Sequence, residues 1–354
     1  MKLNFRLKEI LDEHRVNRRG IIKNITDHTS LERHQVATLM ANKTRYLSLD
    51  TLAQICDYLI QHHRVNPQDL PGLLFGKEPD SFWDLFRREH LEVCLGIRRS
   101  GDEAWVTDSD AFMQGTLLNG ISAPGLVARR KAQFLQQHLV PAPNAETGAP
   151  DQTVAKNLYK AFAEQGSNRA LVAIGSVKIC SITELVVANA MRADPFDSQD
   201  SIRRPQDRKC PFLFAYRADD PKVPSCCGGI KLARSKPLKK PGIYYEQADG
   251  QWVGCPWSKT ADAAIIFYNY RPPVERLEVV LGGFSGRATR SLALALRAWA
   301  GKLWPPCYVT PQLEIGAFIV QFTFDADKSA GGSSQPVVEV IPLAGEVFKR
   351  RLRK

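Results

Sequence analysis

The side chains that most often perform acid, base or nucleophilic chemistry are unevenly distributed along the 354-residue chain. All seven histidines precede residue 139; they are His14, His28, His34, His62, His63, His90 and His138. The region from residue 151 onward therefore lacks the histidine that Ser–His–Asp catalysis, Cys–His catalysis and many zinc sites use. Carboxylate chemistry stays open there through Glu184, Asp194 and Asp262, although Glu184 also fits a helix cap. We assign no catalytic residue and expect no enzyme.

Four of the eight cysteines are close together in the sequence, at Cys210, Cys226, Cys227 and Cys255. Four thiolates are able to hold a structural zinc ion, but such sites usually contain CxxC pairs, and this sequence has none. Adjacent cysteines are also poor ligands for one tetrahedral ion. We therefore expect free thiols and no metal or cofactor, with a zinc site as the open alternative.

Two glycine-containing turns each follow a strand-like segment and precede a helix-like one. The first is Gly175-Ser176, after the apolar run 170–174, and the second is the segment 282–286, after the apolar run 277–281. Such turns bring backbone N–H groups and a helix N-terminus to one edge of a sheet, where anions bind. Neither turn is a Walker A loop or a full GxGxxG fingerprint, so turns that only connect elements are the alternative.

We predict that both turns line one pocket for a small anionic ligand, with nucleotide-like molecules among the candidates. The predicted ligand-binding residues are Gly175, Ser176, Lys178, Gly282, Gly283, Ser285, Gly286 and Arg287, with Arg290 as an additional charge.

The elements around these turns alternate between strand and helix. Apolar runs predict strands at 90–97, 170–174, 210–216, 261–268, 277–281, 315–324 and 336–341, and a hairpin over 244–253. Helical periodicity covers 110–121, 152–164, 181–191 and 289–299, and Ser181 and Glu184 have capping-box spacing. Repeated strand–turn–helix units are typical of an α/β, Rossmann-like sheet.

The N-terminal region has a different pattern. Apolar residues at helical spacing predict short helices at about 7–11, 20–28, 32–40 and 49–59, and Pro67 and Pro71 end the helical region. The segment 25–43 reads ITDHTSLERHQVATLMANK, and the segment 48–56 reads SLDTLAQIC. Together they resemble helices two to four of the Cro/phage-repressor (XRE-like) helix-turn-helix family. Thr26 and Ser30 depart from the alanine and glycine usual in that family.

The resemblance implies that the third helix enters the major groove of double-stranded DNA and that the protein binds two half-sites as a homodimer or higher homo-oligomer. It assigns base contacts to Arg33, His34, Gln35 and Thr38, and phosphate contacts to Lys43, Arg45, Arg18, Arg19 and Lys23. A helical bundle that only mediates protein contacts is the alternative. The resemblance covers about a fifth of the chain and also fits regulators that carry a Rossmann-like C-terminal region.

The predicted protein is therefore multi-domain. We expect an all-α helix-turn-helix domain at 1–76, a bridging α/β segment and linker at 77–150, and an α/β Rossmann-like sensor or assembly domain at 151–354. The formal net charge of +11 favours a polyanionic partner. The basic end of the chain, 349–354, is expected to be a solvated tail or an additional phosphate contact. The N-terminus lacks the apolar core of a signal peptide and no run is long enough for a membrane span, so we expect a cytoplasmic protein without a membrane partner.

These observations together predict a transcriptional regulator whose C-terminal domain senses a small anionic ligand or mediates oligomerisation. Two alternatives stay open: a nucleotide-processing enzyme located by its DNA-binding domain, and a non-catalytic scaffold.

Overall fold

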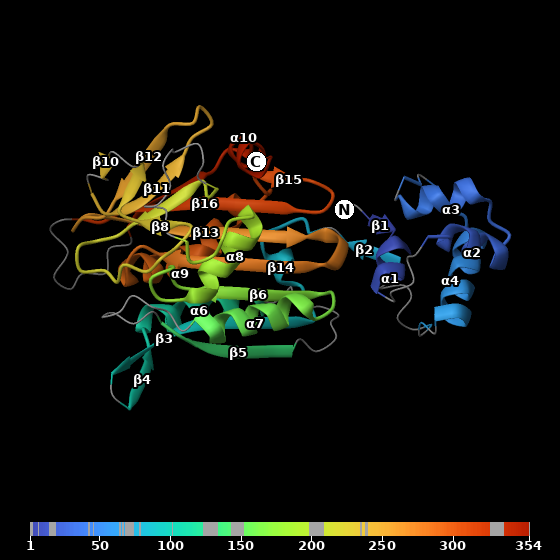
Figure 1. Ribbon diagram of the computed structural model, residues 1–354, viewed down its shortest axis with the longest axis horizontal. Helices are drawn as coiled ribbons and strands as arrows, with labels where there is room; N and C mark the ends of the chain where they lie inside the picture. Colours follow the sequence, from blue (N-terminus) through green and yellow to red (C-terminus); the bar gives the residue numbers. More distant parts are fainter. Residues whose placement is uncertain are drawn as a thin grey trace. The chain divides into compact units, whose positions relative to one another are not determined.

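The computed structural model describes residues 3–5, 7–13, 19–41, 43–44, 46–63, 65, 67, 74–77, 79–100, 102–122, 134–142, 152–197, 209–233, 236–237, 240–325 and 336–353. The chain divides into two compact units, Met1–Asp80 and Ser81–Lys354. Each unit has its own apolar core and is described separately (Figure 1).

Among its described residues, the first unit has four helices and a short two-stranded sheet. The helices are α1 (Leu7–Glu13), α2 (Ile21–His28), α3 (Arg33–Met40) and α4 (Leu49–His63), and strand β1 (Leu3–Phe5) pairs antiparallel with β2 (Phe75–Lys77). One core holds the apolar faces of all four helices, with Ile25, Val36, Ile55 and Leu59 fully buried or nearly so. The helical periodicity of the sequence therefore identified most of the buried positions, whereas Leu49, at the start of α4, is 83% exposed.

The turn between α2 and α3 is closed by side chains. The backbone N–H and the hydroxyl of Ser30 both donate to the side-chain oxygen of Gln54 on α4, at 2.9 and 2.8 Å. The Thr29 hydroxyl donates to the Ile25 carbonyl. Ser30 is not among the described residues with positive φ, so this turn does not need a glycine at position 30.

The second unit is α/β, as its alternating pattern predicts. Its α-helices are α6 (Asp108–Ile121), α7 (Gln152–Glu164), α8 (Ser181–Met191), α9 (Gly286–Trp299) and α10 (Gly345–Leu352), with 3₁₀ turns at Trp83–Phe86, Pro272–Val274 and Ala300–Leu303. The large sheet contains β3 (His90–Ser100), β4 (Glu103–Val106), β5 (Phe134–Pro141), β6 (Arg169–Ile174), β13 (Ala261–Arg271), β14 (Arg276–Gly283), β15 (Tyr308–Val309), β16 (Glu314–Thr323) and β17 (Val337–Pro342). A small sheet contains β7 (Phe212–Ala215), β8 (Gly228–Gly229), β11 (Gly242–Glu246) and β12 (Trp252–Pro256), and β9 (Lys231–Ala233) pairs with β10 (Lys236–Pro237). No helix among the described residues has both the length and the apolar character to cross a bilayer.

The large sheet is mixed. Neighbouring strands in the sheet follow the order β15-β16-β13-β14-β6-β3-β4. In addition, β17 pairs with β16, and β5 pairs with β3. Strands β14, β6, β3 and β5 run parallel, whereas β13, β16 and their neighbours pair antiparallel. The chain enters the parallel part at β3, adds β5 on one side and returns to add β6 on the other. The strand order therefore reverses between β3 and β6.

Both faces of this sheet are covered. Helices α6 and α9 pack on one face, where Leu117 and Leu292 join the core. Helices α7 and α8 and the small sheet pack on the other, where Phe162, Val186 and Phe214 join a second core. Figure 1 shows α7 and α8 in front of the sheet, with α7 running alongside β5 and β6. The sheet is thus the middle layer, which explains why β6 and β14 are continuous apolar runs.

The expected division at residue 151 is wrong. Strands β3 and β5 lie before it, yet β3 forms parallel pairs with both β5 and β6 in one sheet. The bridging segment is therefore part of the C-terminal unit, and the boundary between units falls at Asp80. This unit consequently contains His90 and His138, so the expectation of a histidine-free domain is also wrong. His138 pairs with Glu92 at 2.9 Å within the sheet.

The basic C-terminal segment folds instead of forming a solvated tail. Residues Gly345–Leu352 form α10, and Arg351 is 3% exposed. Its Nε donates to Glu246 Oε2 at 2.7 Å, and Arg350 donates to Glu246 Oε1 at 2.9 Å. A buried carboxylate on β11 thus fixes the end of the chain, and neither arginine is free for phosphate.

Candidate functional site

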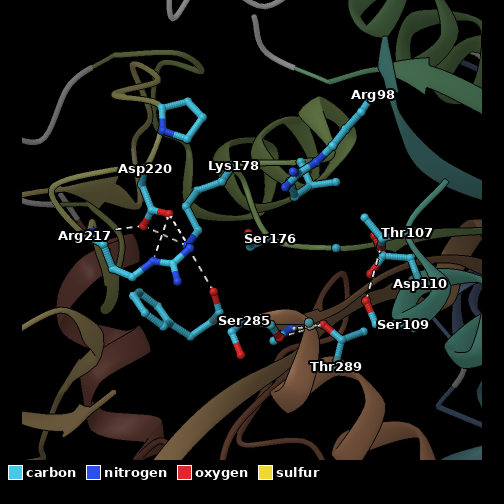
Figure 2. A pocket seen from close by; sticks show the side chains of 16 residues that line it. Arg98, Thr107, Ser109, Asp110, Ser176, Lys178, Arg217, Asp220, Ser285 and Thr289 are labelled. Carbon is cyan, nitrogen blue, oxygen red and sulfur yellow. Dashed lines mark hydrogen bonds and ion pairs between the residues drawn. The ribbon is translucent and has the colours of Figure 1, made fainter. Parts of the chain in front are cut away.

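A pocket of about 200 Å³ lies where β3, β6 and β14 end, at the position where the strand order reverses. Ligands of doubly wound sheets bind at this type of position, because neighbouring connections leave the sheet on opposite faces. Its lining comprises Arg98, Thr107, Ser109, Asp110, Gly175, Ser176, Lys178, Ile179, Arg217, Asp220, Pro221, Gly283, Phe284, Ser285, Gly286 and Thr289. Figure 2 shows these side chains, with Ser176 between a group containing Lys178 and Asp220 and a group containing Asp110.

The structure brings both glycine turns to this one pocket. Of the eight residues named from sequence, six line it: Gly175, Ser176, Lys178, Gly283, Ser285 and Gly286. Gly282 and Arg287 do not. The Arg287 guanidinium donates to the carbonyls of Lys259, Ser258 and Ala261, so it braces a loop. Arg290 lies outside the lining and pairs with Asp108 at 3.7 Å.

Two glycines are needed for the shape of the turns. Gly175 has φ +112°, a conformation that other residues rarely adopt. A Cβ on Gly283 would lie 2.3 Å from the Thr289 amide nitrogen, so a side chain there would displace the start of α9. Thr289 also accepts a hydrogen bond from the Gly283 N–H. Both turns are thus fixed by backbone requirements that the glycines satisfy.

One side of the pocket carries a closed group of charges. Lys178 Nζ lies 2.9 Å from Asp220 Oδ2 and 3.0 Å from the Phe284 carbonyl oxygen. Arg217 donates to Asp220 Oδ1 at 2.9 Å. Burial opposes the charged form of Asp220, but the hydrogen bonds from Arg217 and the charge of Lys178 outweigh it and lower the pKa of Asp220. Burial lowers the pKa of Lys178. This pair fastens residues 217–221 over the turn after β6.

The other side of the pocket carries Asp110 and Arg98, which do not form an ion pair like that of Lys178 and Asp220. Asp110, in the first turn of α6, is 4% exposed, and burial raises its pKa to about 6. Hydrogen bonds from Thr107 and Ser109 and the charge of Arg98 act in the opposite direction. Arg98, at the end of β3, lines the pocket and has no salt bridge within the described residues. Asp110 therefore holds a buried negative charge at neutral pH at a cost in stability.

Replacing Asp110 with asparagine is expected to raise the free energy of unfolding of this unit at pH 7 by as much as about 3 kcal/mol. A carboxyl whose folded pKa lies above its unfolded value contributes stability below the unfolded pKa. That contribution is lost as pH rises to about 6. The variant should therefore lack the decline in stability that is expected of the wild type between about pH 4 and pH 6. Urea unfolding at several pH values measures this, with the exposed Asp102→Asn as the matched control. Equal pH slopes for wild type and Asp110→Asn would contradict it.

Catalytic carboxylate chemistry finds little support in the geometry. Asp262 is 1% exposed and accepts hydrogen bonds from the Ser285 hydroxyl and the Ala263 N–H. Ser285 follows β14 and precedes α9, the place of a nucleophilic serine in some hydrolases, but its φ is −126° instead of the strained turn of those enzymes. Asp194 is exposed. The Asp262–Ser285 contact is therefore a brace for the turn.

Glu184 has a structural role that the sequence did not indicate. The N-cap of α8 is Cys180, so the expected capping box from Ser181 to Glu184 is wrong. Glu184 Oε1 accepts from the N–H groups of Cys226 and Phe196, and Oε2 accepts from the Ser225 hydroxyl. The carboxylate thereby connects α8 to two loops.

The cysteines lie close to this carboxylate. Glu184, Cys226 and Cys227 offer ligand atoms within 4.8 Å of one another, and Cys210 Sγ lies 3.5 Å from Cys226 Sγ. The carboxylate oxygens are already occupied by three protein donors, and burial raises the pKa of both the Cys226 and the Cys227 thiols. The donor set thus fits buried thiols around a hydrogen-bonded carboxylate better than a metal centre.

The residues assigned to DNA lie at the start of α3 and in the segment after it. Arg33, His34, Gln35 and Lys43 are exposed, and Thr38 is half-buried. Gln35 Oε1 accepts from the Glu32 N–H as part of a capping box, His34 Nδ1 lies 3.0 Å from Glu32, and the Thr38 hydroxyl donates to the His34 carbonyl. Arg33 has no such local partner. Arg19 and Lys23 lie at the N-terminal end of α2, whereas Arg18 and Arg45 lie outside the described residues.

Sequence reasoning missed the lining residues that come from other elements, namely Arg98, Thr107, Ser109, Asp110, Arg217 and Asp220. The sequence did contain a pattern that could have identified Thr107, Ser109 and Asp110 at the start of α6. The segment Val106-Thr107-Asp108-Ser109 lies between a strand and a helix, as the two glycine turns do, and lacks only the glycine. Arg217 and Asp220 follow β7, and no local pattern indicates that they approach β6.

Comparison of the chain with family models, curated proteins and solved structures finds no match.

Proposed function

We propose that the protein is a sequence-specific, DNA-binding transcriptional regulator. In this proposal its first unit is a helix-turn-helix domain and its second unit a Rossmann-like sensor of a small anionic ligand. The observation that carries the DNA-binding half is the exposed start of α3, where Arg33 has no partner among the described residues, above a helix whose opposite face is buried. A recognition helix requires this division between its faces.

The contacts that each assigned residue already makes within the protein determine how readily it can contact DNA. Arg33 is free to form the bidentate contact with guanine that arginine makes in the major groove. Gln35 uses its carbonyl oxygen in the capping box, and His34 faces Glu32, so both need to give up a contact before reading a base. Thr38 is bonded to its own helix. Arg33 is therefore the principal reader, and exposed Lys43 is placed for a phosphate.

Selection from a random DNA pool with the intact protein tests this proposal and returns the half-site and its spacing. Arg33→Ala should then weaken binding to the selected site by about 1–3 kcal/mol and relax the preference at one base pair. Arg297→Ala removes an exposed arginine of the second unit and serves as the matched control. Mobility shifts at one salt concentration measure both variants, because phosphate contacts make affinity salt-dependent. Failure to enrich any motif would refute the DNA-binding half, and equal affinities for the two variants would refute Arg33 as its principal reader.

The pocket supports the sensing half. A scaffold without a ligand would be expected to fill the space between the two glycine turns with side chains, whereas a cavity of about 200 Å³ occupies it. As mechanism, ligand binding changes the geometry of a homodimer and hence the half-site spacing that it accepts. A ligand shifts such an equilibrium only if it binds the two states unequally. Mobility shifts with and without a metabolite that raises the melting temperature test this, and unchanged DNA affinity would refute the sensing half.

A further inference from the structure

Several hydrogen-bond donors around the pocket have no acceptor among the residues that the structure describes. Ser176 is 4% exposed and lines the pocket, yet its hydroxyl has no hydrogen-bond partner within the described residues. The hydroxyl lies open to the pocket, so Ser176 offers a hydrogen-bond donor to a molecule that enters it.

A second source of donors is the start of α9. The N-cap residue Ser285 makes no capping bond, because its hydroxyl donates to Asp262 instead. The first N–H groups of an α-helix have no acceptor within the helix, and the helix dipole adds positive potential there. Gly286, at the first position of α9, lines the pocket. Arg98, near the end of β3, adds a guanidinium that forms no salt bridge within the described part of the chain.

These donors approach the pocket from three directions. In Figure 2 Arg98, Ser176 and Ser285 come from different elements and surround one space. A carboxylate is planar and offers two oxygens, whereas a phosphate group is tetrahedral and offers three oxygens to separate donors. A ligand phosphate thus satisfies this set better than a carboxylate.

Asp110 makes a different demand. Asp220 forms an ion pair with Lys178, whereas Asp110 forms no such pair within the described residues. Its carboxylate would repel a phosphate placed directly against it. A ligand hydroxyl between the two removes the conflict, because it donates to the carboxylate. The pocket therefore combines a place for an anion with an acceptor for hydroxyl groups.

We propose that the pocket binds a phosphate monoester of a hydroxylated carbon skeleton, such as a pentose phosphate, free or within a nucleotide. The phosphate lies against Ser176, the start of α9 and Arg98, and a sugar hydroxyl donates to Asp110. This inference deepens the sensing half of the proposed function by naming the class of ligand, and it does not depend on DNA binding.

Isothermal titration of the full-length protein with ribose 5-phosphate, inorganic phosphate and acetate, at one ionic strength and pH 7.5, tests the proposal. Ribose 5-phosphate should bind more tightly than inorganic phosphate, and acetate should not bind measurably. Ser176→Ala and Arg98→Gln should each weaken phosphate binding about tenfold. Arg99→Gln changes the neighbouring arginine, which does not line the pocket, and should bind as the wild type does. Adenosine monophosphate in a fourth arm distinguishes a nucleotide from a free sugar phosphate.

Asp110→Asn separates the two parts of the recognition. It should bring the affinities for ribose 5-phosphate and inorganic phosphate closer together without abolishing either. Acetate binding as tight as phosphate binding would overturn the proposal, as would wild-type affinity in both Ser176→Ala and Arg98→Gln. So would a folded protein that binds no phosphate compound. These outcomes leave the Arg33 experiment unaffected, so failure of the ligand class and failure of DNA binding are distinguishable.

Discussion

Replacing Glu184 with alanine is expected to lower the free energy of unfolding of the second unit by about 3–5 kcal/mol. The residue is 1% exposed, and its carboxylate accepts hydrogen bonds from the Ser225 hydroxyl and from the N–H groups of Cys226 and Phe196. In the variant the buried donors of Ser225 and Cys226 and the half-buried N–H of Phe196 lose their acceptor, and each buried group left in this way costs about 1–3 kcal/mol. The loss should exceed that of a typical surface substitution several-fold.

Urea unfolding followed by tryptophan fluorescence measures this loss in the second unit alone, because all six tryptophans follow residue 80. Glu164→Ala, at an exposed helix end where Glu164 lies 3.8 Å from Lys160, should cost no more than about 0.5 kcal/mol. Glu184→Gln keeps one acceptor oxygen and should fall between the two. If the wild type gained stability from added zinc and Glu184→Ala did not, Glu184 would be a metal ligand instead.

Glu184 also illustrates why local patterns predicted elements better than roles. The helix 181–191 was predicted correctly, since its apolar run and preceding turn are local features. The capping role was wrong because the Ser-x-x-Glu spacing is equally compatible with a carboxylate that turns toward distant loops. Residues 225 and 226 are about forty positions away, and sequence spacing contains no information about that approach.

The strands show the same limit. Apolar runs predicted β6, β13, β14 and β16, which are largely buried. Strand β5 was missed because most of its side chains are exposed, so its sequence, FLQQHLVP, lacks an apolar run. The boundary at residue 151 was expected because the Pro- and Ala-containing segment 141–150 is typical of a linker, and without β5 no local pattern connected the segment before it to the sheet after it. Pairing β3 with β5 and β6 is a property of the folded sheet.

The pocket was predictable only in part for a related reason. Glycine turns are readable because backbone geometry restricts them to few residue types, and the two turns do line one cavity. Asp110 and Arg98 belong to ordinary helix and strand ends, where their residue types indicate nothing special. Their importance arises from the position of β3 next to β6, where the strand order reverses.

Replacing Arg351 with alanine is expected to cost about 3 kcal/mol or more in the free energy of unfolding of the second unit. Arg351 and Glu246 are each 3% exposed, and their contact of 2.7 Å joins α10 to β11. Removing one partner of a buried pair leaves the other charge without its main compensation. Arg350 also contacts Glu246, but its side chain is 37% exposed, so it compensates only in part.

The matched control is Arg353→Ala, which removes an exposed arginine from the same segment and should change stability by no more than about 0.5 kcal/mol. The double variant Arg351→Ala/Glu246→Ala completes the test. Since it leaves no buried carboxylate uncompensated, it should lose less than the sum of the two single losses, with a coupling of about 1 kcal/mol or more. Similar losses for Arg351→Ala and Arg353→Ala, or strictly additive losses in the cycle, would show that the end of the chain is a solvated tail after all.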